Sequence, residues 1–129
     1  MKEPKVELTQ GEWAIMRAVW AAEPCAAPTV QEALAATKKW SYSTVRTLMD
    51  RMVAKGLLRA EKVRHLTLYR ATVTSAQAQQ GEILSALKTA FNGALGPMME
   101  CLLETRGVSA AELTELEELL RRKRKGIKP

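Results

Sequence analysis

The stretch WSYSTVRTLMDRMVAK, residues 40–55, combines an apolar side with a side rich in hydroxyl and guanidinium groups. Its apolar residues recur at the spacing of one helical face: Val45, Leu48, Met49, Met52 and Val53. The opposite face carries Ser43, Thr44, Arg46, Thr47, Asp50 and Arg51. Short hydroxyl side chains let a helix approach phosphates closely, and the arginine fork donates to phosphates or to guanine edges. This face is suited to the major groove of DNA; the alternative is an ordinary solvated helix.

Asp50 is the one acid on that polar face. A carboxylate repels a polyanion, so the presence of Asp50 on this face requires an explanation. It either orients Arg46 or Arg51, or it accepts a hydrogen bond from the amine of a cytosine.

Basic residues gather around this stretch instead of being spread along the 129-residue chain, whose net charge is +6. Residues 38–70 carry nine Lys and Arg against two Asp and Glu. Residues 71–120 carry two basic and seven acidic residues, and residues 121–129 carry six basic and no acidic ones. A local basic block on a folded domain indicates a polyanionic partner more strongly than uniform basicity does.

The elements before this stretch are predicted to be helical. Residues 8–22 have one apolar helical face, and Thr9 and Glu12 have the spacing of a capping box. Pro24 and Pro28 are expected to keep the helix from continuing, because proline has no amide hydrogen to donate.

A short second helix is expected over residues 29–39, with Thr29 as its N-cap. The polar-faced stretch forms the third helix, capped by Ser41 or Ser43. Gly56 fits the position just past its C-terminal end, where a left-handed residue commonly stops a helix.

The pattern then changes to alternation, with Leu66 and Leu68 separated by Thr67. Two short antiparallel strands are predicted, at about 57–62 and 66–72, with a turn near residues 63–65. Three helices followed by a two-stranded hairpin describe a winged helix-turn-helix.

The C-terminal half is predicted to be helical, with many apolar residues for its length. They are Leu84, Leu87, Phe91, Leu95, Met99, Leu102, Leu103, Leu113, Leu116 and Leu120. Short helices cannot hide all of these alone, so pairing with a second copy of the chain is the simplest solution. The alternative is that these helices fold back onto the winged part.

No residue set points to catalysis or to a bound cofactor or metal. The chain has one histidine, no glycine-rich phosphate loop and no nucleophile with its base. Its two cysteines, Cys25 and Cys101, lie far apart, which fits a reducing cytoplasm, and both are expected to be small buried apolar residues. No run is long and apolar enough to span a membrane. The chain is therefore not expected to be an enzyme.

Three segments together resemble the penicillinase/methicillin-resistance repressor family (the BlaI/MecI/CopY type). They are LTQGEWAIMRAVW, WSYSTVRTLMDRMVAKGLL and LYRATV. The match covers residues 8–73 well, and the W-S…T-V-R-T-L…R run is its most specific part. The later helices match in layout more than in motif.

The resemblance implies dimeric repressors, in which a winged helix binds operator DNA and the C-terminal helices of two protomers interlock. It makes Thr44, Arg46 and Thr47 groove-facing residues, and Ser41 and Arg51 phosphate contacts. Arg64 and His65 lie where the tip of the wing would reach DNA.

The chain departs from the family where inducing signals act. Antibiotic-responsive members are cut by a sensor-linked protease at an Asn-Phe bond, but the gapless alignment places Cys101-Leu102 there. Such a protease as a partner would need another bond. The paired Cys-x-Cys motifs of copper-responsive members are absent, which excludes copper sensing by that motif.

We therefore expect a mainly α fold with a small β hairpin: a winged helix-turn-helix in residues 1–73 and a helical dimerisation domain with a basic tail in residues 74–129. The expected function is that of a cytoplasmic homodimeric transcriptional repressor. It would bind a two-fold symmetric double-stranded DNA operator through the helix at about 43–55. The alternative is a helical adaptor whose basic block binds an acidic protein.

Overall fold

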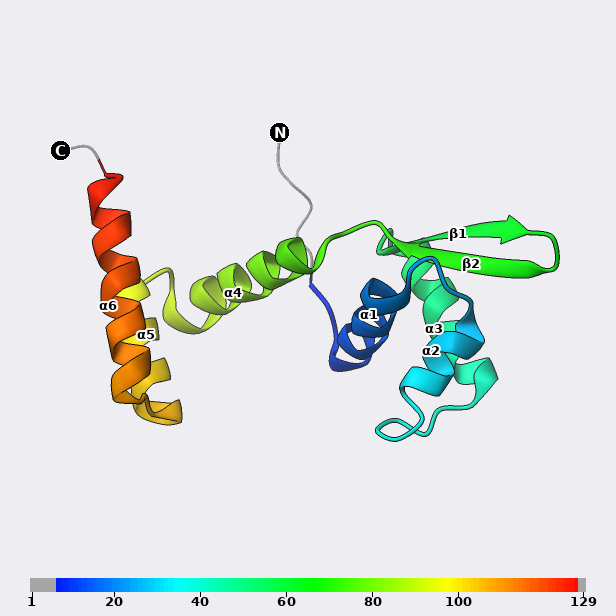
Figure 1. Ribbon diagram of the computed structural model, residues 1–129, viewed down its shortest axis with the longest axis horizontal. Helices are drawn as coiled ribbons and strands as arrows, with labels where there is room; N and C mark the ends of the chain where they lie inside the picture. The colour runs from blue at the N-terminus through cyan, green and yellow to red at the C-terminus, as the bar shows by residue number, and fades with distance from the viewer. Residues whose placement is uncertain (1–6, 128–129) are drawn as a thin grey trace. The chain divides into compact units, whose positions relative to one another are not determined.

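The computed structural model describes residues 7–127, which form six helices and one two-stranded antiparallel sheet (Figure 1). The elements follow in the order α1 Gln10–Ala22, α2 Ala27–Ala33, α3 Tyr42–Ala54, β1 Leu58–Val63, β2 Leu66–Ala71, α4 Ser75–Phe91, α5 Leu95–Arg106 and α6 Ala110–Lys125. The predicted fold class, mainly α with a small β hairpin, is confirmed. The chain divides into two compact units, Met1–Ser85 and Ala86–Pro129.

Local signals begin α1 and α3 and end α3 as predicted. Thr9 and Glu12 form the capping box of α1, in which each side chain accepts a hydrogen bond from the other residue's backbone N–H. Ser41, rather than Ser43, is the N-cap of α3. Gly56 follows the last residues of α3 with a φ of +83°, in the left-handed region that glycine adopts easily.

The expected start of the second helix, with Thr29 as its N-cap, was wrong because proline is accepted in the first turn of a helix. Helix α2 begins at Ala27 with Ala26 as its N-cap, so Pro28 lies inside its first turn and Thr29 is not the cap. Helix α5 likewise contains Pro97 in its first turn. The first N–H groups of a helix have no partner within it, so proline costs nothing there and its fixed φ favours the helix.

The hairpin has a tighter turn than predicted. Leu58 pairs with Ala71 and Val63 with Leu66, so only Arg64 and His65 form the loop. Arg64 takes a left-handed φ of +59° in place of the glycine that such turns usually use.

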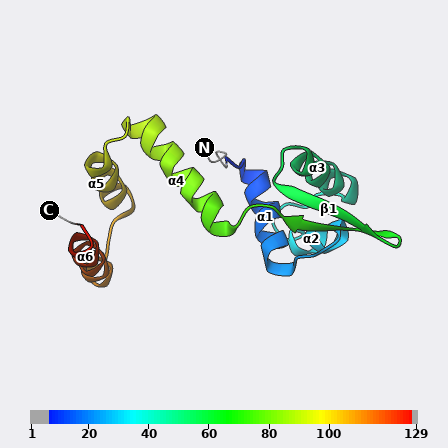
Figure 2. The ribbon, with the colours of Figure 1, turned by 90° about the horizontal axis from the view of Figure 1, so that it is seen from above.

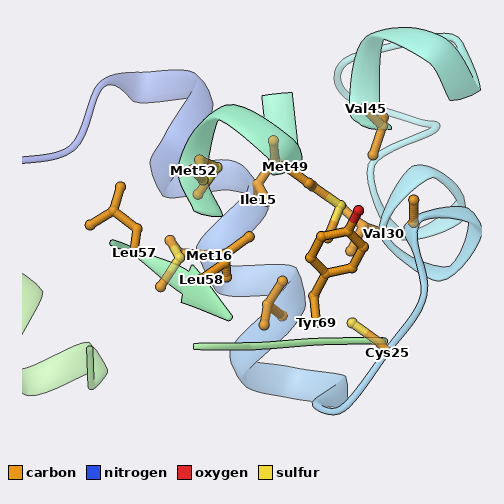
Figure 3. Packing of buried hydrophobic residues seen from close by; sticks show 12 residues of the cluster. Ile15, Met16, Cys25, Val30, Val45, Met49, Met52, Leu57, Leu58 and Tyr69 are labelled. Carbon is orange, nitrogen blue, oxygen red and sulfur yellow. The ribbon is translucent and has the colours of Figure 1, made fainter. Parts of the chain in front are cut away.

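The core of the first unit lies between α1, α2, α3 and the hairpin (Figures 1 and 2). Figure 3 shows this cluster, which includes Ile15, Met16, Val19, Val30, Val45, Met49, Met52, Leu58 and Tyr69, all at most 2% exposed. Three of them, Val45, Met49 and Met52, belong to the apolar face of α3. Burial of this face holds α3 on the unit and leaves its polar face outward.

The second unit differs in that α5 and α6 contain no buried residue. Helix α6 nevertheless has a complete capping box, in which Ser109 and Glu112 exchange hydrogen bonds. Arg121 of α6 also pairs with Glu118, three residues earlier, at 2.9 Å. A local signal therefore defines the start of α6, although the helix has no buried residue.

Candidate nucleic-acid interface

Three hydroxyl groups cluster at the N-terminal end of α3. Ser41 Oγ accepts from the backbone N–H of Thr44 at 3.2 Å and donates to Thr44 Oγ1 at 3.0 Å. Ser43 Oγ lies 3.1 Å from Ser41 Oγ. All three side chains are exposed. The cluster presents hydroxyls and a helix N-terminus together, and both groups favour an anion such as phosphate.

Arg46 is held by two neighbours on its own helix. Its Nε donates to Asp50, 3.3 Å from Oδ2, and its Nη1 donates to the hydroxyl of Tyr42 at 3.3 Å. The hydrogen bond to Tyr42, with the negative charge of Asp50, raises the pKa of Arg46 further above its already high value. Of the two roles foreseen for Asp50, the contact with Arg46 is present.

Asp50 is itself held from the hairpin. The hydroxyl of Tyr69, on β2, donates to Asp50 Oδ1 at 2.8 Å. The Tyr69 side chain is fully buried. Burial, followed by the hydrogen bond to Asp50, raises the pKa of Tyr69 to about 12. Tyr69 therefore stays a neutral donor at physiological pH, and it links the hairpin to the polar face of α3.

The remaining predicted site residues are exposed at two places. Thr47 and Arg51 lie on α3. Arg64 and His65 form the turn of the hairpin, which projects beyond α3 in Figures 1 and 2. The structure thus gathers Ser41, Ser43 and Thr44 into one cluster and holds the hairpin turn apart from it.

The register of the hairpin adds residues that the sequence did not single out. Arg59 and Arg70 are direct cross-strand partners, and both are exposed. Like charges placed opposite each other destabilise a sheet unless an anion lies between or above them. Tyr69 was also missed, because its contact with Asp50 joins residues far apart in the chain. Tyr42 was missed too, although it lies four residues before Arg46 on the same helix, a spacing that could have indicated the contact. Only the pairing of β1 with β2 could have revealed the two arginines.

The predicted dimerisation residues are all at least partly exposed in the single chain. Leu84, Leu95 and Leu120 are the most exposed, at 62%, 63% and 67%. Leu102 and Leu113 are exposed, whereas Leu87, Phe91, Met99, Leu103 and Leu116 are half-buried. Exposed apolar surface of this extent indicates an interaction site.

Other kinds of site receive no support from the part of the chain that the structure describes. Within residues 7–127, no three His, Cys, Asp or Glu side chains lie close enough to hold a metal ion. No helix in that range is long and apolar enough to cross a membrane. Cys25 is buried as predicted, but Cys101 is exposed, because α5 has no core to cover it.

The sequence of this chain is similar to those of known proteins. The sequence profile of the penicillinase repressor family matches residues 8–122. The chain is 24% identical over 123 residues to the methicillin resistance regulatory protein MecI of Staphylococcus aureus, covering 95% of this chain and 100% of that protein. It is 25% identical over 114 residues to the penicillinase repressor of Bacillus licheniformis, covering 88% and 89%.

A solved structure shares the fold of the first unit. It is the monomeric form of BlaI from Bacillus licheniformis in complex with the blaP half-operator. The TM-score is 0.50 with 22% sequence identity, over 57% of this chain and 90% of that one. The three-helix and hairpin arrangement is therefore a winged helix.

Proposed function

The chain belongs to the penicillinase repressor family, as its motifs predicted, and we propose that it acts as a homodimer on a two-fold symmetric operator. Membership makes it a DNA-binding transcriptional repressor and not an enzyme. We assign DNA binding to residues 1–73 and dimerisation to residues 74–129. As DNA is its partner, the cytoplasm is the expected compartment.

The observation that carries this proposal is the division of α3 into two faces. Val45, Met49 and Met52 are buried in the core, so the hydroxyl and guanidinium groups of the other face point away from it. We assign Thr44, Arg46 and Thr47 to base edges in the major groove. Ser41, Ser43 and Arg51 are assigned to phosphates on either side. The half-operator complex of the related BlaI supports this use of the fold.

The hairpin supplies a second set of contacts in this proposal. Arg64 and His65 at its turn reach the DNA backbone or the minor groove. Arg59 and Arg70, paired across the strands, bind a phosphate that offsets their mutual repulsion.

The dimer is proposed from the exposed apolar residues of α4, α5 and α6. A helix with no buried side chain gains little from its own chain, and pairing with a second copy would remove those leucines from water. A two-fold dimer requires two half-sites, separated by one or more turns of the DNA helix.

The inducing signal is a separate question. A sensor-linked protease fits only if it cuts a bond other than that at residues 101–102, which are Cys and Leu. The one Phe-Asn pair nearby, Phe91-Asn92, is in the reverse order and lies at the end of α4.

Selection from a randomised duplex pool followed by titration against salt tests the proposal. We expect one two-fold sequence to be enriched and to bind at least about a thousandfold more tightly than random duplex. The logarithm of its affinity should fall steeply with the logarithm of salt concentration. Equal, weak binding to all duplexes would instead favour the adaptor that binds an acidic protein.

A further inference from the structure

We propose that Asp50 and Tyr69 are positioning residues that present the guanidinium of Arg46 to a guanine in each half-site. The inference rests on the proposed function, because it concerns how α3 reads one base of the operator. It assigns Asp50 no direct contact with a base.

The contacts of Arg46 leave hydrogens available on both of its terminal nitrogens. Arginine has five N–H groups. Nε uses its hydrogen on Asp50, and Nη1 uses one hydrogen on Tyr42. The remaining hydrogens lie on the two terminal nitrogens, which together form a pair of parallel donors. Guanine is the base whose major-groove edge offers two adjacent acceptors, O6 and N7.

The position of Asp50 is set by the hairpin and not only by α3. The Tyr69 ring lies in the core near Met49, Val30 and Cys25, as Figure 3 shows. Its backbone N–H donates to the carbonyl of Cys25 at 2.8 Å, and its carbonyl accepts from the Cys25 N–H at 3.2 Å. The hydroxyl that donates to Asp50 is thus fixed by both ring burial and backbone pairing.

The Arg46–Asp50 pair would not be rigid without this anchor. The two side chains are 39% and 54% exposed, and an exposed i, i+4 ion pair is weak and mobile. Tyr69 restricts the Asp50 carboxylate to one orientation, and this carboxylate in turn restricts the position of Arg46 Nε. Pre-orientation lowers the entropy that Arg46 must lose on meeting a base. The ion pair with Arg46 also neutralises the Asp50 carboxylate, which would otherwise repel phosphate.

The test uses the full chain and the duplex that the wild-type protein selects from a random pool. Each guanine of a half-site is replaced in turn by 7-deazaguanine, which lacks the N7 acceptor. The variants are Tyr69→Phe, which keeps the buried ring, together with Asp50→Ala and Asp50→Asn. Glu32→Ala on α2 is the matched control, because it also removes one exposed carboxylate.

For the wild-type protein, we expect one guanine at which 7-deaza substitution weakens binding about tenfold. In Asp50→Ala and Tyr69→Phe this penalty should fall to about twofold or less, while binding to random duplex is not weakened. Asp50→Asn, which retains an oxygen acceptor, should keep an intermediate penalty. Glu32→Ala should change binding to all duplexes alike and keep the full penalty. Thermal unfolding checks that each variant is folded.

A full penalty in folded Asp50→Ala and Tyr69→Phe would overturn the proposal. Relaxed preference at a cytosine, with the guanine penalty unchanged, would overturn it too and make Asp50 a direct reader of the cytosine amine. If the wild-type protein selects no duplex at all, that different result contradicts the proposed function itself.

Discussion

The Nζ atom of Lys55 lies 2.6 Å from the Oε2 atom of Glu12, so an ion pair joins the C-terminal end of α3 to the first turn of α1. Glu12 is 7% exposed and also closes the capping box of α1. Lys55 belongs to the basic block by sequence, yet its ammonium group contacts a buried carboxylate of the same unit. The pair therefore helps to fix the orientation of α3 on the scaffold.

Removing the Glu12 carboxylate should destabilise the first unit. Glu12→Gln keeps an acceptor for the backbone N–H of Thr9 but removes the charge that Lys55 meets, so we expect a loss of about 1 kcal/mol. Glu12→Ala also removes the cap and should cost about 1–3 kcal/mol. Urea unfolding near pH 7 measures both. Equal stability of wild type and Glu12→Ala would show that the pair and the cap contribute nothing.

Because of the Glu12 carboxylate, we expect the stability of the first unit to depend on pH. Burial alone would raise the pKa of Glu12, but hydrogen bonds from Lys55 and Thr9, with the Lys55 charge, lower it overall below 4.5. The folded chain therefore holds this proton less tightly than the unfolded chain does. The stabilisation is complete above the unfolded pKa and is lost as pH falls through the folded pKa. The difference in unfolding free energy between wild type and Glu12→Gln should be constant above about pH 5 and shrink below about pH 4. A difference that grows on acidification would contradict this.

Gly56 and Gly11 should respond in opposite ways to substitution by alanine. Gly56 has a φ of +83°, and a side chain in this left-handed conformation costs about 1–2 kcal/mol. A Cβ on Gly11 would lie 3.5 Å from the Trp40 ring, an ordinary contact, on a helical backbone. Gly11→Ala should therefore be neutral or stabilise by up to about 1 kcal/mol. Thermal unfolding of the two variants side by side checks the contrast. A Gly56→Ala variant as stable as wild type would refute the assignment of strain to this position.

Arg46 and Arg51 are two arginines on one helix for which we propose different roles. Arg46→Ala should weaken binding to the selected duplex about ten- to a hundredfold and relax the preference at one base position. Arg51→Ala should weaken binding to all duplexes about equally and reduce the salt slope by about 1. Affinity titrations over a set of single-base variants distinguish the two patterns. Uniform weakening by Arg46→Ala would make Arg46 a phosphate contact.

Phe91 tests the proposed dimer interface. It lies half-buried at the end of α4, and a charge there would have to be desolvated when two copies pair. Phe91→Asp should sediment as a monomer and bind the two-fold duplex poorly. Thr89→Asp, an exposed position on the same helix, is the control and should remain dimeric. A dimeric Phe91→Asp would place the interface elsewhere.

Much of this molecule could be predicted from sequence because the signals are local. The capping pairs Thr9–Glu12 and Ser109–Glu112 join residues three positions apart, so residue type and spacing alone specify these helix starts. The apolar stripe of α3 likewise follows from helical periodicity, and with it the separation of a buried face from a polar one. The family resemblance came from the same local runs.

The contacts that only the tertiary structure determines join residues that are far apart in the chain. Asp50 meets Tyr69 across 19 positions and Lys55 meets Glu12 across 43, so no periodicity encodes either contact. The register of the hairpin places Arg59 opposite Arg70, and a shift of one residue would have separated them. Helix packing and strand pairing bring such groups together, because the burial of many apolar side chains outweighs the preferences of any one of them. The polar face of α3 and the Arg46–Asp50 pair were thus readable from the sequence, but the Tyr69 hydroxyl that holds Asp50 in place was not.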